Sequence, residues 1–168
     1  MKRLAILRHA KSSWADAGMD DFDRPLNDRG RKAARQIGDE FRRRGHRFDL
    51  VLASPAARVR ETLEAVGELG TEIRFEPVIY LASDGQLLSM VRQLAGEVQF
   101  PLIVGHNPGL EQLLAMIACD DAQEFRAQVE GKFPTGALAI VGLDVDGWPH
   151  VGPGCGEIVE LILPRELD

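Results

Sequence analysis

Arg8 and His9 follow directly on the apolar run at 4–7. A short run of this kind is typical of a buried strand, and a buried strand gains nothing in packing from two such polar side chains at its end. In open α/β sheets, ligands bind beyond the carboxyl ends of the strands. The pair therefore predicts an anion-binding site at the end of the first strand.

Two later apolar runs also end in polar side chains. Arg58 follows the run at 50–53, and His106 and Asn107 follow the run at 101–104. Because parallel strands bring their carboxyl ends to one edge of a sheet, we expect these side chains to lie beside the first pair. The sequence thus predicts a crevice that holds two arginines and two histidines.

Phosphoryl transfer is the chemistry that such a cluster suits. Guanidinium groups bind phosphate oxygens in a planar fork and keep their charge. A neutral imidazole nitrogen can attack phosphorus, and neighbouring cations keep an imidazole neutral. No Walker-type loop is present, so a nucleotide cradle is not expected. His9 and His106 could instead be metal ligands, but the adjacent arginines would repel a cation.

The elements that must position these residues alternate along most of the chain. Asn27 is expected to cap a helix that ends at Gly45, Ser83 begins a capping box, and the helix after Arg58 is expected to end near Gly70. Strands are expected at 4–7, 49–53, 73–75, 101–104, 137–143 and 157–163. The last two have no helix between them, which predicts a hairpin. We therefore expect an α/β fold, a three-layer α/β/α sandwich with a mostly parallel central sheet and an antiparallel edge hairpin.

The composition is that of a globular protein. The chain has 168 residues, 45% of them apolar and 27% charged, so we expect one domain over residues 1–168. The net charge of −6 disfavours nucleic acid and anionic membranes as partners. No apolar run is long enough to span a bilayer, and polar residues at 8–11 interrupt any signal-peptide core, so a cytoplasmic location is expected. The oligomeric state is left open, and a monomer is compatible with the sequence.

The remaining histidines and the cysteines are expected to have no part in the chemistry. His46 and His150 lie in polar segments, where a solvated side chain is the default. Cys119 and Cys155 are far apart and form no CxxC pair, so reduced thiols are expected. Trp14 could form a rim of the site or pack on the surface, and the sequence leaves both open.

Four segments resemble the histidine phosphatase (phosphoglycerate-mutase-like) superfamily. They are Leu7–Ala10, Arg24–Gly30, Ser54–Arg58 and Val104–Pro108. The short chain and the residues at 8–12 and 134–137 resemble most the bacterial phosphohistidine phosphatases of the SixA type. The resemblance runs in order from residue 4 to about residue 143, which is most of the chain.

The resemblance implies a phosphoglycerate-mutase-like fold and a role for each matching residue. His9 would attack phosphorus and become a transient phosphohistidine. Arg8 and Arg58 would bind the phosphoryl oxygens, and His106 would complete the pocket and stabilise charge in the transition state. Asn107 would border the substrate. No metal and no cofactor are implied.

One feature of the larger superfamily members is missing. They carry a carboxylate proton donor between the positions of Arg58 and His106, and here no donor motif is recognisable; Glu76 is the best of the carboxylates present. An alkoxide leaves poorly without a proton, so the substrate is expected to be phosphohistidine in a protein or another activated phosphate. The alternatives are a small-molecule phosphomonoesterase and a non-catalytic module that binds phosphate or a phosphoprotein.

Overall fold

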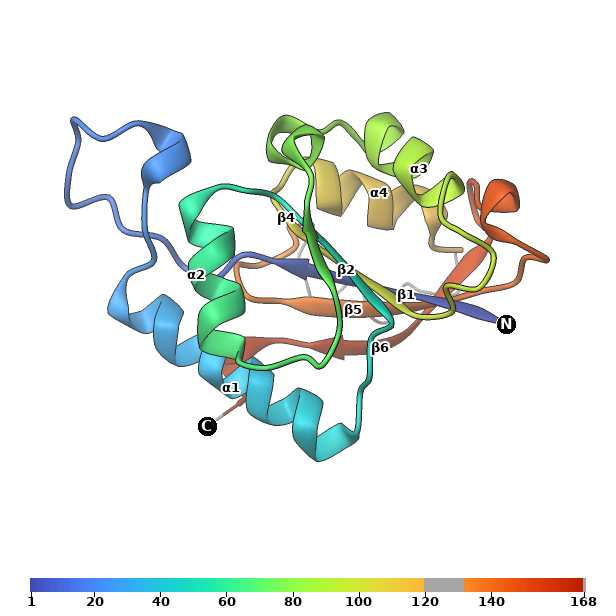
Figure 1. Ribbon diagram of the computed structural model, residues 1–168, viewed down its shortest axis with the longest axis horizontal. Helices are drawn as coiled ribbons and strands as arrows, with labels where there is room; N and C mark the ends of the chain where they lie inside the picture. The colour runs from blue at the N-terminus through green and yellow to red at the C-terminus, as the bar shows by residue number, and fades with distance from the viewer. Residues whose placement is uncertain (120–131, 168) are drawn as a thin grey trace.

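A six-stranded sheet with the strand order β3-β2-β4-β1-β5-β6 forms the centre of the molecule (Figure 1). The computed structural model describes residues 1–119 and 132–167. The strands are β1 (Lys2–Arg8), β2 (Leu50–Ala53), β3 (Ile73–Phe75), β4 (Pro101–Gly105), β5 (Leu138–Leu143) and β6 (Gly156–Ile162). β1, β2, β3 and β4 pair in parallel, whereas β5 pairs antiparallel with both β1 and β6. The predicted parallel sheet with an antiparallel edge hairpin is therefore confirmed.

Helices cover both faces of this sheet. They are α1 (Asp28–Arg44), α2 (Ala57–Val66), α3 (Asp84–Arg92) and α4 (Gly109–Ile117). α1 and α2 pack together on one face of the sheet, and α3 and α4 pack together on the other (Figure 1). Short 3-10 helices stand at Asp21–Asp23, Pro77–Leu81, Trp148–His150 and Pro164–Glu166. The three-layer α/β/α architecture is confirmed, and no helix in the described part of the chain could cross a membrane.

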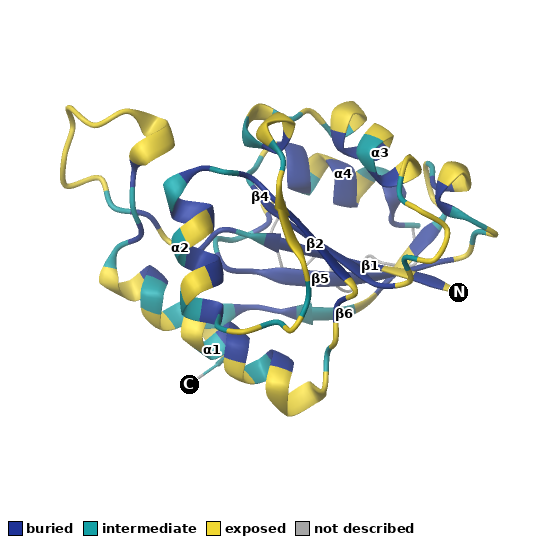
Figure 2. Cartoon of the chain, in the orientation of Figure 1, coloured by how far each residue is buried: buried dark blue, intermediate teal, exposed yellow. Residues whose placement is uncertain are grey.

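The apolar residues of β1 explain why this strand lies in the interior. Leu4 and Ile6 pack in the core under α3 and α4, whereas Ala5 and Leu7 pack in the core under α1 and α2. All four are fully buried, and Figure 2 shows β1, β2 and β4 as mostly buried, whereas the edge strand β3 is exposed. Burying each large aliphatic side chain contributes about 1.5–3 kcal/mol, so the strand that carries the predicted site is firmly fixed.

The start of α1 is anchored to the segment that follows β1. The Asn27 side chain accepts a hydrogen bond from the Gly30 amide at 2.8 Å, as its predicted capping role requires. A Cβ atom at Gly30 would lie 2.1 Å from the carbonyl oxygen of Lys11. Only glycine therefore lets the helix approach the backbone just beyond His9. At the other end, Gly45 has φ 71° and ends the helix as predicted.

Two predictions about local structure are wrong. α2 ends at Val66 rather than near Gly70, because Gly67 adopts a φ of 93° that takes the chain out of the helix. His46 is not solvated: its ring lies among phenylalanines, 6.3 Å from the ring of Phe41, and its Nε2 lies 2.9 Å from a carboxylate oxygen of Glu160. The left-handed turn at the end of α1 folds the chain back against the helix and leaves this side chain only 11% exposed. The capping box at Ser83 and the exposed position of His150 agree with prediction.

Candidate active site

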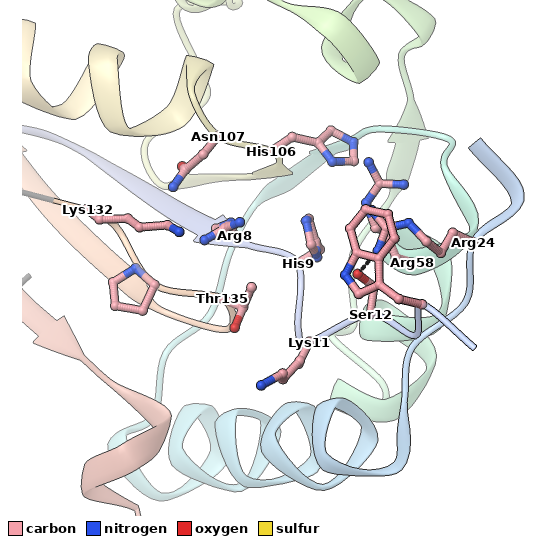
Figure 3. Close-up of a pocket in the computed structure, with 12 residues that line it drawn as sticks. Arg8, His9, Lys11, Ser12, Arg24, Arg58, His106, Asn107, Lys132 and Thr135 are labelled. Carbon is pink, nitrogen blue, oxygen red and sulfur yellow. Dashed lines mark hydrogen bonds between the residues drawn. The ribbon is translucent and has the colours of Figure 1, made fainter. Parts of the chain in front are cut away.

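A cavity of about 530 Å³ lies beyond the carboxyl ends of β1, β2 and β4 (Figure 3). Its described lining residues are Arg8, His9, Lys11, Ser12, Trp14, Arg24, Arg58, His106, Asn107, Lys132, Pro134 and Thr135. All five residues that the sequence placed in the site are among them. Strands far apart in the sequence thus bring these side chains together, as the parallel topology predicts.

A single hydrogen bond fixes the tautomer of His9. Its Nδ1 lies 2.7 Å from the carbonyl oxygen of Ala10. A carbonyl oxygen can only accept, so Nδ1 carries the proton and Nε2 keeps a free lone pair. The Ala10 amide in turn donates to the Thr62 hydroxyl at 3.0 Å, and that hydroxyl donates to the Arg58 carbonyl oxygen at 2.7 Å. α2 therefore holds the backbone that orients the imidazole.

Burial keeps both histidines neutral. It lowers the pKa of His9 to about 3 against the opposing backbone hydrogen bond to Ala10, and repulsion between a protonated His9 and His106, Arg58 and Arg8 adds to this shift. Burial also lowers the pKa of His106 to about 3, with Arg58 as the next cause. The two ring centroids lie 5.2 Å apart. Near neutral pH the cavity therefore holds two neutral imidazoles beside guanidinium cations.

The arginines combine charge with unused donor groups. Arg8 Nη1 donates to the carbonyl oxygen of Phe133 at 3.1 Å, and Arg58 donates through both Nη atoms to Asp21. The Nε atoms of Arg8 and Arg58 are buried and have no hydrogen-bond partner within the described structure. Buried donors without partners cost free energy. An anion in this cavity would supply acceptors for such donors.

Neighbouring groups hold the remaining two predicted residues. His106 Nε2 lies 2.7 Å from the hydroxyl oxygen of Ser54, which is completely buried at the end of β2. The Asn107 amide nitrogen donates to the Phe133 carbonyl oxygen at 2.7 Å and to a Glu111 carboxylate oxygen at 3.2 Å. Asn107 thus lines the cavity while it ties the loop after β4 to the segment that precedes β5.

Comparison with known proteins identifies the family. The model of the histidine phosphatase superfamily (branch 1) matches residues 4–79. A solved structure from Agrobacterium tumefaciens, named as a candidate phosphohistidine phosphatase SixA, is 34% identical, with 97% of this chain and 98% of that chain covered and a TM-score of 0.81. The chain belongs to the histidine phosphatase superfamily.

Two further similarities extend this picture. This histidine phosphatase chain is 36% identical over 163 residues to the uncharacterised protein Rv1276c of Mycobacterium tuberculosis, with 95% of this chain and all of that protein covered. A phosphoserine phosphatase from Entamoeba histolytica is 13% identical, covers both chains fully and has a TM-score of 0.65. The last similarity shows the fold alone, which is the phosphoglycerate-mutase-like fold that the sequence resemblance implied.

Asp21 contacts Arg58 from the long loop after β1, and the sequence analysis did not identify it. Its Oδ2 accepts from Arg58 Nη2 at 3.1 Å and from the Tyr80 hydroxyl at 2.7 Å, and its Oδ1 accepts from Arg24 Nη2 at 3.1 Å. The Tyr80 hydrogen bond, then those of Arg24 and Arg58, lower the pKa of Asp21 to about 2. Asp21 is therefore an anion at neutral pH. No spacing or motif marks this position.

Arg24 is a further cation of the cavity that the sequence did not assign to the site, although it belongs to one of the resembling segments. It is buried, donates to the Ser12 hydroxyl, and lies 3.7 Å from the ring centroid of Trp14. Trp14 itself is 77% exposed and lines the cavity. Of the two alternatives for Trp14, the structure favours the rim.

Glu76, which the sequence analysis names as the best candidate for a proton donor, does not line the cavity. Its amide donates to the Ala53 carbonyl oxygen at the end of β2. No carboxylate occurs among the described lining residues. In the described part of the chain, there is no group of three or more histidine, cysteine, aspartate or glutamate side chains that could hold a metal ion.

Proposed function

We propose that this protein is a phosphatase that works through a covalent phosphohistidine on His9, and that residues 1–168 act as one catalytic domain. The observation that carries the proposal is the hydrogen bond from His9 Nδ1 to the Ala10 carbonyl oxygen. It leaves Nε2 unprotonated in a cavity lined by guanidinium groups. A neutral imidazole among fixed cations is suited to attack a phosphoryl group.

The reaction proceeds in two displacements at phosphorus. His9 Nε2 forms a bond to phosphorus while the bond to the leaving group breaks, and the leaving group takes that electron pair. Arg8 and Arg58 bind the non-bridging oxygens, and His106 stabilises the charge that develops. Water then attacks phosphorus, the bond to Nε2 breaks, and phosphate and a proton are released. The guanidinium groups supply the positive charge, so no step requires a metal or cofactor.

The lack of a carboxylate proton donor among the described lining residues favours phosphohistidine as the substrate. No carboxylate lines the described cavity, and Asp21, which contacts Arg58 from the loop after β1, has a pKa of about 2 and cannot donate a proton at neutral pH. A phosphate ester would have to lose an alkoxide without help. The imidazole of a phosphohistidine can be protonated in solution before it leaves. A histidine-phosphorylated protein is therefore the proposed partner, and the similarity to the Agrobacterium SixA protein supports it.

One observation favours a small phosphomonoester as the second candidate substrate. A cavity of about 530 Å³ falls in the size range of small-molecule sites. The third candidate function, a non-catalytic phosphate-binding module, shares the same cations and differs only in the absence of turnover.

Labelling of the enzyme tests the covalent step. The protein is incubated with ³²P-labelled phosphoramidate, and label that is acid-labile and base-stable is expected on the wild type and absent from His9→Ala. His150→Ala is the matched control, because His150 is exposed and does not line the cavity. Label retained in His9→Ala, or phosphate binding without any label in the wild type, would contradict the mechanism.

Turnover decides between the substrates. A histidine-phosphorylated protein and a set of sugar phosphates are compared by kcat/KM on the same enzyme. We expect a preference of at least about 100-fold for the phosphohistidine, since an unassisted alkoxide is a poor leaving group. A preference for the sugar phosphates would establish the second candidate.

A further inference from the structure

A second depression, which we call the side groove, adjoins the catalytic cavity. It has a volume of about 390 Å³ and shares Lys11, Pro134 and Thr135 with the cavity. Its other lining residues are Arg29, Lys32, Ala33, Gln36, Leu163, Pro164 and Arg165. Figure 3 shows the Lys11 side chain extending away from His9 toward α1. The groove thus leads from the site of chemistry along the helix.

One face of α1 forms a wall of the side groove. Arg29, Lys32, Ala33 and Gln36 recur at intervals of three and four residues, which places them on one side of a helix. The 3-10 helix Pro164–Glu166 and the residue before it form another part of the lining. The lining thus combines the apolar residues Ala33, Pro134, Leu163 and Pro164 with the cations Lys11, Arg29, Lys32 and Arg165.

The charge of the combined lining is unlike that of the rest of the chain. The cavity and the side groove together hold eight of the chain's 20 lysines and arginines, and no carboxylate lines either in the described structure. The whole chain nevertheless has a net charge of −6. Cations are therefore concentrated along this path, although the protein is acidic.

The ion pairs of α1 involve arginines that do not line the side groove. Away from the groove, Arg31, Arg42 and Arg43 pair with carboxylates of the same or a neighbouring helix. In contrast, Arg29 and Lys32 are exposed and have no carboxylate within 4.0 Å among the residues described. Arg29 and Lys32 are therefore available to an anionic ligand, as is the exposed Arg35 outside the groove.

We propose that the side groove binds an acidic segment of the phosphorylated protein, next to the phosphohistidine in the sequence of that substrate. This inference rests on the proposed function, because it deepens the identity of the substrate of the same site. Charge complementarity carries it: the exposed cations Arg29 and Lys32, together with the apolar lining residues of the groove, fit a peptide that combines carboxylates with small apolar side chains. Rim charges of this kind govern encounter and KM more than the chemical step.

Two phosphohistidine peptides test the groove, one flanked by glutamates and one by glutamines in the same positions. We expect the wild type to prefer the glutamate peptide through KM, and salt of about 0.5 M to abolish the preference by screening. Lys32→Glu is expected to lower kcat/KM for the glutamate peptide about fivefold, because an exposed charge contributes modestly and is here reversed. Its effect on phosphoramidate is expected to stay below about twofold, since Lys32 does not line the catalytic cavity.

Arg47→Glu is the matched control, because it makes the same type of charge reversal on an exposed residue beyond the other end of α1. Equal losses in Lys32→Glu and Arg47→Glu, or equal kcat/KM for the two peptides, would overturn the proposal in favour of a general field effect. An RNA oligonucleotide that competes as well as the glutamate peptide would also overturn it, because the groove would then be a general polyanion site.

Binding separates this inference from the proposed function. Fluorescence anisotropy of the labelled, unphosphorylated glutamate peptide is measured with the wild type, with Lys32→Glu and with the control Arg47→Glu. If neither protein cleaves phosphoramidate but Lys32→Glu weakens peptide binding and Arg47→Glu does not, the catalytic proposal fails and the groove stands. If phosphoramidate is cleaved and the peptide does not bind, the groove fails and the catalytic proposal stands.

Discussion

Asp21 and Arg58 form a two-point contact at the edge of the cavity. Arg58 Nη1 donates to the Asp21 backbone carbonyl oxygen at 2.8 Å, and Nη2 donates to its carboxylate at 3.1 Å. The guanidinium proposed to hold the phosphoryl group is thus already bound to an anion of the protein. The carboxylate orients Arg58, and its negative charge opposes the entry of another anion.

Substitution Asp21→Asn separates these two effects. Removal of the charge while the backbone contact remains is expected to tighten the binding of inorganic phosphate about three- to tenfold, because a repulsion across a partly exposed site is lost. Isothermal titration calorimetry measures the Kd. Asp23→Asn removes the same charge from the same loop and should leave the Kd within about twofold. Weaker phosphate binding in Asp21→Asn would show that orientation of Arg58 is the main role of this carboxylate.

Ser54 is expected to act by positioning His106. Ser54→Ala removes the hydroxyl that lies 2.7 Å from His106 Nε2. A ring that can turn spends less time in the reactive geometry, so we expect phosphoenzyme formation to slow about tenfold. Single-turnover labelling measures this rate. The same hydroxyl accepts from the Ala56 amide, so a loss of about 1 kcal/mol in the free energy of unfolding is expected alongside. If the free energy of unfolding falls by this amount and the rate of phosphoenzyme formation is unchanged, Ser54 has a purely structural role.

Gly30→Ala tests how closely α1 must approach the segment after His9. The added Cβ would stand 2.1 Å from the Lys11 carbonyl oxygen, and the backbone on both sides must move to relieve the contact. We expect the free energy of unfolding to fall by about 2–3 kcal/mol, as for other overpacked sites, with activity reduced as well. Urea denaturation measures the change.

Gly85→Ala is the matched control, since Gly85 also lies in the first turn of a helix and its nearest contact would be a side-chain oxygen at 3.9 Å. Alanine there is expected to be neutral or to stabilise by up to about 1 kcal/mol. A stability of Gly30→Ala equal to that of Gly85→Ala would mean that the contact with residue 11 is readily relaxed.

The parts of the site that the sequence predicts are those fixed by strand ends. Arg8 ends β1, His9 comes directly after it and His106 follows β4, so any parallel pairing of these strands brings the three together. Asn27 and Gly45 bounded α1 because capping chemistry is local. Such features depend on a few neighbouring residues, and a single sequence contains them.

The parts of the site that the sequence does not predict depend on contacts between irregular segments. Asp21 and Tyr80 stand on two separate 3-10 helices, at 21–23 and 77–81, and the ring of Phe22 lies 5.0 Å from that of Tyr80. No hydrophobic period marks either segment. Their meeting at Arg58 follows from tertiary packing, which also placed His46 in an aromatic cluster rather than in water.

The protonation states of His9 and His106 give the sharpest test of the site's electrostatics. Their pKa values are lowered to about 3, below the value of about 6.5 for a free histidine, so both stay neutral as the pH falls from about 8 to about 5. In ¹H–¹³C NMR spectra, the Cε1–H signals of these two residues, assigned with His9→Ala and His106→Ala, should not titrate over that range. The unfolded chain binds these protons near pH 6.5 and the folded chain does not, so the free energy of unfolding should also fall as the pH drops below about 6.5. Inorganic phosphate should raise the pKa of His106, because its charge offsets that of Arg58, the second cause of the shift. A titration of either signal centred near 6.5 without phosphate would show that the imidazoles are not held neutral, and the nucleophilic role of His9 near neutral pH would lose its electrostatic basis.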